Sequence, residues 1–233
     1  VSLTSPAGST VAIVGENCAG LTTLVKLLVG LYRPTTGTIE ADGVDVTTIE
    51  PRAWRHGLSG AFQDTPTLNL RLREVVGIGD VTKLHDDAAI SKALAAADAI
   101  DVLPEMPNGL ETELGRPFEG GVQLSGGQWQ RLALARAMMR PTARALLLDE
   151  PTANLDPQAE HAVFERYART LREKSRHGGF TILVSHRFST VHMADFIVVL
   201  NDGRIVEQGT HVELMALDGR YAELLRLQAK GYQ

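Results

Sequence analysis

Three short apolar runs along the chain are each followed by a polar loop and then by a helical pattern. The runs are Val11–Val14, Ala145–Leu148 and Thr181–Val184. Apolar runs of this length, bounded by turn residues, are typical of buried strands. Because strands that alternate with helices form parallel sheets, the pattern predicts an α/β fold, a mostly parallel sheet flanked by helices.

The section from about Asp64 to Arg140 has a different pattern. Its segments "DDAAISKALAAADAI" and "GGQWQRLALARAMMR" are rich in helix formers, and no convincing strand lies between them. We therefore expect a helical lobe of about residues 64–140, inserted into a sheet lobe formed by about residues 1–63 and 141–233. Both lobes belong to a single domain in this interpretation.

The C-terminal third contains a hairpin signal and two helical patterns. In "FIVVLNDGRIVEQG", two β-rich arms flank Asn201-Asp202-Gly203, a sequence typical of a tight β-turn. The segment "HVELMALDGRYAELLRLQAK" then predicts two amphipathic helices that are interrupted at Asp218-Gly219.

Composition excludes several classes of protein. The 233 residues are 44% hydrophobic and carry a net charge of -5, so no overall basic field exists to bind nucleic acid. The single cysteine, Cys18, cannot form an internal disulfide, which favours a reducing cytosolic setting. No apolar run approaches the roughly 20 residues that a membrane-spanning helix needs. The abrupt start at Val1 suggests a piece of a longer polypeptide.

The first candidate for chemistry is a phosphate-binding loop. After the run Val11–Val14, the stretch "GENCAGLTT" follows the form G-x-x-x-x-G-K-[ST] except at one position. A helix that begins near its second glycine would direct backbone N–H groups at a phosphate, and Thr22 would offer its hydroxyl to Mg²⁺. The residues expected to hold nucleotide are Gly15, Glu16, Asn17, Cys18, Ala19, Gly20, Leu21, Thr22 and Thr23.

Two positions in this loop depart from the pattern. Leu21 replaces the lysine, which removes a charge-assisted contact to phosphate of about 1.5–3 kcal/mol. ATP affinity is then expected to be roughly 10- to 100-fold weaker. Leucine is also expected to leave an apolar group facing anionic oxygens. Cys18 adds a β-carbon where the backbone must approach the phosphate. Without its lysine, such a loop is also compatible with an ordinary strand-to-helix turn.

The second candidate is the acidic pair at the end of "ALLLDEP". Strand alternation would send the side chains of Asp149 and Glu150 to opposite faces, so that one joins the Mg²⁺ shell while the other faces a water. An isolated pair of this kind is more often a solvated strand end. The pair gains weight because it follows a phosphate-type loop in the same chain.

Five elements in this order resemble the nucleotide-binding domain of ATP-binding cassette transporters, which has a P-loop NTPase-type fold with a RecA-like lobe and a helical lobe. They are the loop at Gly15–Thr23, "AFQD" around Gln63, "LSGGQWQR" from Leu124 to Arg131, "LLLDEPTANLD" from Leu146 to Asp156, and "SHR" around His186. The "LSGGQ" element is the most specific to the family.

The resemblance implies a role for each match. Gln63 would sense the γ-phosphate and Mg²⁺, and Glu150 would polarise the attacking water while His186 contacts the γ-phosphate. Asp149 would join Thr22 and Gln63 around the metal. Ser125, Gly126, Gly127 and Gln128 would bind the nucleotide held by the opposite subunit, and Asp156 would lie at that dimer interface.

Segments such as "LPEMPNGLETELG" resemble the exporter branch of the family. There the resemblance implies ATP and Mg²⁺ as cofactors, a head-to-tail dimer, homo- or heteromeric, and a transmembrane domain upstream in the same polypeptide. The domain would work at the cytoplasmic face of the membrane, with coupling surfaces near Gln63 and Gly115–Gly121. Two alternatives stay open: a non-hydrolysing half that lends its "LSGGQ" face to a partner, and a soluble cassette ATPase without transport.

Overall fold

The computed structural model describes residues 1–16, 19–62, 67–150, 179–185 and 188–231. The chain divides into two compact units. The first, here called the sheet unit, contains residues 1–58, 143–150 and the described residues from 179 onward. The second, the helical unit, contains residues 59–142 among those described. The division falls inside one short strand, Leu58–Ala61.

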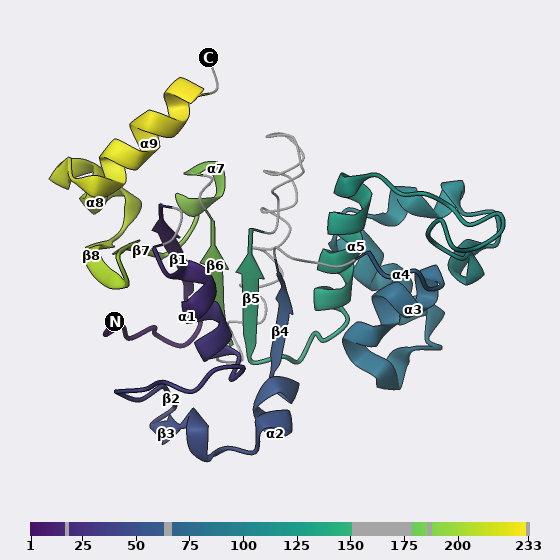
Figure 1. Cartoon of the computed structure of the whole chain (residues 1–233), viewed down its shortest axis with the longest axis horizontal. Coiled ribbons are helices and arrows are strands. Elements are labelled where there is room, and N and C mark those ends of the chain that lie inside the picture. Colours follow the sequence, from purple (N-terminus) through teal and green to yellow (C-terminus); the bar gives the residue numbers. More distant parts are fainter. Residues whose placement is uncertain (17–18, 63–66, 151–178, 186–187, 232–233) are drawn as a thin grey trace. The chain divides into compact units, whose positions relative to one another are not determined.

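Five strands of the sheet unit, together with β4 at the division, form a six-stranded sheet with strand order β4-β5-β6-β1-β7-β8 (Figure 1). Strands β1, β5, β6 and β7 are mutually parallel, and β8 runs antiparallel to β7. The mostly parallel sheet with flanking helices confirms the predicted fold class. The strands are β1 (Thr10–Gly15), β4 (Leu58–Ala61), β5 (Ala145–Asp149), β6 (Phe180–Val184), β7 (Phe196–Asn201) and β8 (Arg204–Gly209).

The three predicted apolar runs form β1, β5 and β6, which are buried almost throughout. A parallel strand covered on both faces has no solvent side, so its sequence is continuously apolar rather than alternating. Helix α1 (Leu21–Leu28) packs on this sheet, and its Val25 joins a core cluster with Ile13, Leu147 and Val198. The hairpin between β7 and β8 is also confirmed. Asp202 and Gly203 at its turn have φ of 46° and 72°, as a type I′ turn requires.

The remaining elements of the sheet unit are short or lie after β8. Before β4 come β2 (Glu40–Ala41), β3 (Val44–Asp45), η1 (Val46–Thr48) and α2 (Pro51–His56), and α7 (Phe188–Val191) precedes β7. The predicted pair of C-terminal helices is confirmed as α8 (His211–Leu217) and α9 (Arg220–Gly231), which lie together beside β8 (Figure 1). Asp218 ends α8 in the left-handed conformation, with φ of 52°.

The helical unit packs its helices around α5 (Gly126–Met138). Helices α3 (Leu72–Gly77) and α4 (Asp87–Ala96) contact it, and Leu72, Leu94, Leu132 and Leu134 are fully buried. Short helical turns complete the unit: η2 (Ile78–Lys83), η3 (Ile100–Glu105) and η4 (Gly109–Glu111). The two segments that the sequence predicted to be helical form α4 and α5.

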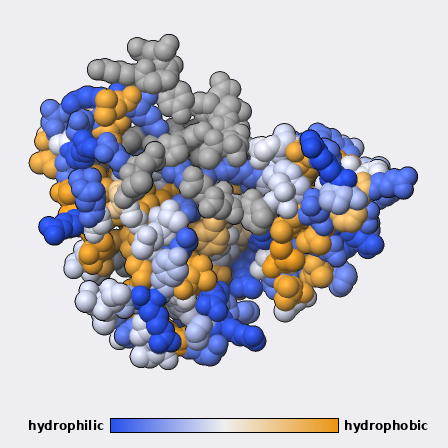
Figure 2. Space-filling model, in the orientation of Figure 1, coloured by the Kyte–Doolittle hydropathy of each residue, from blue (hydrophilic) through white to orange (hydrophobic). Residues whose placement is uncertain are grey.

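Some hydrophobic side chains are exposed at the surface. On the face that Figure 2 shows, orange residues occur in groups separated by blue and white ones. Exposed apolar side chains include Val206, Val212 and Leu217 of the sheet unit and Val81 of the helical unit. Among the residues described here, no helix is both long enough and apolar enough to span a bilayer.

Candidate nucleotide site

Three parallel strands bring the predicted chemistry to one edge of the sheet. Strand β6 lies between β1 and β5, and its last residue, Val184, pairs with Ile13 on one side and Asp149 on the other. Because the three strands are parallel, the loops that follow them all start at the same edge of the sheet, the edge of the carboxyl ends. In open α/β sheets this edge is where ligands bind. The phosphate-type loop after Gly15 and the acids Asp149 and Glu150 therefore share an edge within the sheet unit.

The phosphate loop begins at a position with no room for a side chain. A β-carbon on Gly15 would lie 2.5 Å from the carbonyl oxygen of Leu200 and 2.9 Å from the β-carbon of Ala19. The Ala19 amide donates to the Glu16 carbonyl at 3.0 Å, which closes a turn. Gly20 then takes φ of 100°, a conformation open mainly to glycine, and caps α1. The sequence pattern thus matches a local backbone requirement at both glycines.

Helix α1 exposes its N-terminal turn at the end of this loop. The N-cap residue is Gly20, which has no side chain that could accept hydrogen bonds from the first N–H groups of α1. Thr22 and Thr23 are exposed on this turn. N–H groups at a helix start attract anions, and a threonine hydroxyl is a hard oxygen donor. This turn has the chemistry to hold phosphate and magnesium.

Leu21 differs from its prediction. The sequence suggested that its apolar side chain would face anionic oxygens, but the side chain is half-buried and packs against the core cluster that includes Ala19, Val25 and Leu200. An apolar side chain at the first helical position gains more by covering the sheet than by facing solvent. The loop therefore loses a cation at this position without gaining an apolar group among the phosphates.

The acidic pair is buried, but not by strand alternation. Asp149 and Glu150 are 6% and 7% exposed, respectively. Strand β5 ends at Asp149, and Glu150 turns into the left-handed region with φ of 49° while its amide donates to Val184 at 2.9 Å. The alternation argument is therefore wrong at Glu150, because this residue no longer belongs to the strand. Positive φ is uncommon for a non-glycine residue, and of the described residues it also occurs at Asp202 and Asp218, in a turn and at a helix end.

Magnesium fits the residues at this edge. Mg²⁺ keeps most of its water and is usually held by one or two carboxylates together with substrate phosphates. Asp149 and Thr22 could supply one carboxylate and one hydroxyl to such an ion. Among the described residues, no three His, Cys, Asp or Glu side chains gather into a metal-binding cluster. Ser185, which follows β6, is also buried at this edge and was missed by the sequence reasoning.

Several predicted site residues lie outside the described residues. They are Asn17, Cys18, Gln63, Asp156 and His186. Their predicted roles at the phosphate, the metal and the dimer interface therefore stay predictions.

The serine-glycine element starts α5 in the helical unit. Ser125 and Gln128 form a capping box. The Gln128 amide donates to the Ser125 hydroxyl at 3.2 Å, and the Ser125 amide donates to the Gln128 side-chain oxygen at 2.8 Å. The Gln128 side-chain nitrogen also donates to Glu105 at 2.9 Å. The cap leaves the amides of Gly126 and Gly127, the first two of the helix, directed outward. Amides at a helix start can bind an anion, so these two are candidate donors to a phosphate.

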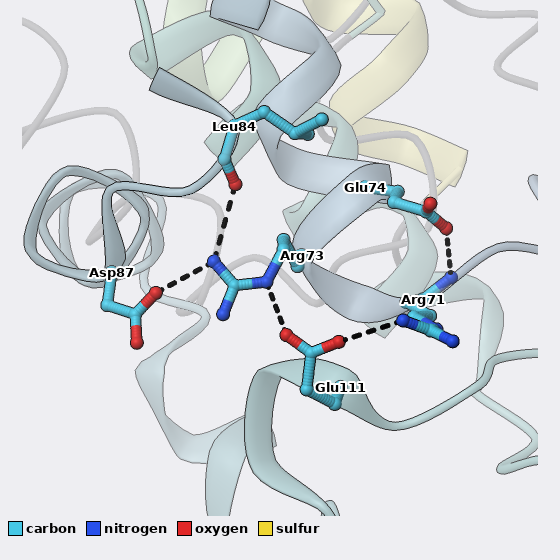
Figure 3. A network of polar contacts seen from close by, with 6 residues as sticks. All are labelled: Arg71, Arg73, Glu74, Leu84, Asp87 and Glu111. Carbon is cyan, nitrogen blue, oxygen red and sulfur yellow. Dashed lines mark hydrogen bonds and ion pairs between the residues drawn. The ribbon is translucent and has the colours of Figure 1, made fainter.

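A charged network joins three segments of the helical unit (Figure 3). Arg73 donates to Glu111 at 2.5 Å and to Asp87 at 2.7 Å, and Arg71 contacts Glu111 at 3.2 Å. The hydrogen bond to Asp87, followed by that to Glu111, raises the pKa of Arg73. The hydrogen bond from Arg73 likewise lowers the pKa of Glu111. Beside the network lies a pocket of about 400 Å³, lined by residues that include Arg71, Glu111, Glu113 and Glu119.

A second pocket, of about 470 Å³, lies in the sheet unit between the N-terminal residues and β8. Neither of these two pockets is lined by the phosphate loop or by the acidic pair. The case for a nucleotide site therefore depends on the shared strand edge, the exposed start of α1 and the buried acids.

Known proteins are similar to this chain in sequence and fold. The family model described as ABC transporter matches residues 1–153. The chain is 41% identical over 226 residues to a beta-(1-->2)glucan export ATP-binding/permease protein of Agrobacterium fabrum, and 42% identical over 228 residues to an ATP-dependent lipid A-core flippase of Bordetella avium. These matches cover 97% and 98% of the chain but only 37% of each relative.

A mycobactin import ATP-binding/permease protein of Mycolicibacterium thermoresistibile is 39% identical, over 96% of the chain and 37% of that protein. A bacterial Atm1-family ABC exporter, solved with ATP bound, superposes with a TM-score of 0.84 at 34% identity, over 95% of this chain and 37% of the other. The chain thus spans a little over a third of the length of these relatives. The sequence, the sheet and the loop at its edge agree with one another: the chain belongs to the ABC transporter family.

Proposed function

We propose that this chain is the ATP-binding, ATP-hydrolysing domain of an ABC exporter, with its own site weakened at Cys18 and Leu21. The observation that carries the proposal is the convergence of a phosphate-type loop and two buried acids at one edge of a parallel sheet. Family membership supports it, because such domains couple ATP to transport.

At its own site, the chain would hold MgATP mainly through the backbone. The amides at the start of α1 would bind phosphate oxygens, and Thr22 and Asp149 would hold the metal with Gln63 nearby. Magnesium would neutralise charge that builds on the transferring phosphoryl group. The buried Glu150 would orient and polarise the attacking water, and His186 would contact the γ-phosphate.

A second copy, or a related subunit, would complete the site. The amides of Gly126 and Gly127 would form a second phosphate-binding helix start, at the beginning of a different helix and in a different unit from the first. We propose that Ser125–Gln128 closes over the nucleotide of the opposite subunit in a head-to-tail dimer. Asp156 would lie at that interface.

Transport would require a transmembrane domain, which the relatives carry as permease parts of the same protein. We propose that the domain works at the cytoplasmic face of the membrane. It would contact the permease through the surface near Gln63 and Gly115–Gly121. The pocket of about 400 Å³ described above lies beside this segment, since its lining includes Glu119 and Gly120. Export is proposed rather than import because two of the three relatives described above are an export protein and a flippase.

The test is to restore the cation. Leu21→Lys is expected to tighten MgATP binding by about 10- to 100-fold, since a lysine–phosphate contact contributes about 1.5–3 kcal/mol. The lysine stem can keep part of the packing of Leu21 on the core while its ammonium reaches the loop. Leu21→Met is the matched control, because it keeps the apolar volume and adds no charge.

Calorimetric titration with MgATP and phosphate release measure the two effects. Glu150→Gln in the lysine background is expected to keep binding and abolish phosphate release. If Leu21→Lys neither binds ATP more tightly than Leu21→Met nor hydrolyses it, the motor proposal is wrong.

The packing of Leu21 also favours a second candidate, a subunit that lends its Ser125 face and does not hydrolyse ATP itself. A leucine that covers the core leaves no side-chain cation in the loop. The two candidates separate when the chain is mixed with a competent partner domain. Stimulated turnover that disappears with Ser125→Ala and survives Glu150→Gln supports the lending subunit.

A further inference from the structure

An ion pair connects the C-terminal helix α9 to the phosphate loop. The guanidinium of Arg220, at the start of α9, contacts the Glu16 carboxylate at 2.7 Å. Its other terminal nitrogen contacts Glu223 at 2.6 Å. The side chains of Arg220 and Glu16 are 32% and 51% exposed. The hydrogen bond with Glu223, together with the charge of Glu16, raises the pKa of Arg220.

Arg220 is held in place by its backbone. Glu207 of β8 accepts hydrogen bonds from the Arg220 amide and, at 2.9 Å, from the Tyr221 amide, so one carboxylate caps the start of α9. Tyr221 is fully buried, and its hydroxyl lies 2.8 Å from His211 Nδ1. These contacts fix the point from which the Arg220 side chain reaches the loop.

The same part of the chain also holds the loop backbone. Gly15 pairs with Leu200 in β7, and the Gly203 amide in the β7–β8 turn donates to the Ala19 carbonyl at 3.0 Å. The phosphate loop is therefore contacted at its beginning and near its end by residues that follow β6. Arg220 adds the only contact of this set that carries a charge.

The charge matters because of what the loop lacks. Across residues 15–23, "GENCAGLTT", the one charged side chain is that of Glu16. A carboxylate at the start of a phosphate loop lies within a Debye length of any phosphate held there and repels it. The ion pair with Arg220 places a positive charge beside this carboxylate.

We propose that Arg220 is a positioning residue for nucleotide binding, which holds the Glu16 carboxylate in an ion pair so that the phosphate loop can accept an anion. This inference rests on the proposed ATP-binding function. It assigns to the C-terminal helix a direct part in the site.

The test compares Arg220→Ala with Arg226→Ala. Arg226 lies on the same helix and pairs with Asp218, so its replacement removes the same charge and a similar ion pair without touching the loop. Alanine at 220 keeps the amide that Glu207 caps. MgATP affinity is expected to fall about fivefold with Arg220→Ala, the upper range for an exposed ion pair, and to stay within twofold with Arg226→Ala.

Rescue separates charge from structure. Arg220→Lys is expected to restore most of the affinity, and Glu16→Gln in the Arg220→Ala background is expected to restore it as well, because the unpaired carboxylate is gone. The difference between Arg220→Ala and wild type should shrink in high salt. Equal affinities for Arg220→Ala and Arg226→Ala, or no rescue by Glu16→Gln, would overturn the proposal.

A measurement without nucleotide keeps this test independent of the proposed function. The Ala19 amide, which donates to the Glu16 carbonyl, should exchange its hydrogen faster in Arg220→Ala than in Arg226→Ala, by about fivefold if the pair is worth as much as an exposed ion pair can be. If the wild-type chain does not bind MgATP, the proposed function fails, and unchanged exchange at Ala19 then overturns the positioning role too.

Discussion

Replacing Gly15 by alanine should damage both the sheet and the phosphate loop. The added β-carbon would lie 2.5 Å from the Leu200 carbonyl oxygen and 2.9 Å from the Ala19 β-carbon. Neither neighbour is the flexible end of a long side chain. Leu200 is 2% exposed within β7, and Ala19 is 4% exposed. Strand β1 must therefore move away from β7 at its last pair, or the loop must open.

The expected loss of stability follows from the close contact between the added β-carbon and the Leu200 carbonyl oxygen. Inserting a carbon into a packed core typically costs about 1–3 kcal/mol. For a chain of this size each kcal/mol lowers the melting temperature by about 2–4 °C, so we expect a fall of roughly 2–12 °C. Thermal unfolding followed by circular dichroism measures it. MgATP affinity should fall in parallel, because the displaced segment carries the Ala19–Gly203 hydrogen bond.

Gly57→Ala is the matched control. Gly57 has an ordinary φ of -75°, and a β-carbon there would lie 3.3 Å from the Trp54 carbonyl oxygen. It should change stability by less than about 1 kcal/mol, since the lost backbone freedom of the unfolded chain offsets a slight crowding. Equal melting temperatures for Gly15→Ala and wild type would refute the claim that the Leu200 carbonyl excludes a side chain at Gly15.

Three further outcomes are expected. Ser125→Ala and Thr210→Ala each remove a helix N-cap and should each cost about 1 kcal/mol in urea unfolding, but only Ser125→Ala should reduce ATP turnover; equal turnover would contradict the role of Ser125. Burial raises the pKa of Tyr221 to about 12, so the folded state retains a proton that the unfolded state loses above pH 10.0. The free energy of unfolding should therefore fall by on the order of 2–3 kcal/mol between pH 10.0 and pH 12, and a free energy that does not change with pH in this range would contradict the prediction. The hydrogen bond from Thr82 lowers the pKa of Asp80 from 3.8, so the ionised carboxylate stabilises the folded chain at neutral pH, and this contribution is lost as the pH falls through the lowered pKa. Thr82→Val should reduce the loss of stability between neutral pH and about pH 3, and an unchanged loss would show that this hydrogen bond does not lower the pKa.

The elements that could be predicted from the sequence are those whose residues fit only one kind of environment or backbone conformation. Continuous apolar runs can be buried only on both faces, and they form β1, β5 and β6. The turn at Asp202-Gly203 needs positive φ, so the hairpin was equally clear. Strand β4 was missed because "LSGA" is short and has few large apolar residues. It becomes a strand through its neighbour β5 rather than through its own propensity.

The parts of the site that could be predicted are those encoded by short sequence motifs. The glycines of the loop and the capping box at Ser125 follow from backbone chemistry that a motif encodes. The left-handed backbone of Glu150 was not predictable, because strand alternation was extended one residue too far. The pair between Glu16 and Arg220 has no sequence signature, since each residue is an ordinary surface charge until β7, β8 and α9 place them together.

The position of Leu21 connects these observations. A lysine at the first position of α1 would supply a cation to the loop, and its replacement leaves Glu16 as the loop's one charged side chain. Leu21 packs on the core, so the substitution removes a charge from this position of the loop. The electrostatics of the site then depend more on Arg220 than they would with lysine present. It follows that Arg220→Ala should weaken MgATP binding less in the Leu21→Lys background than in the wild type, and additive effects in this double-mutant cycle would show that the two cations act independently.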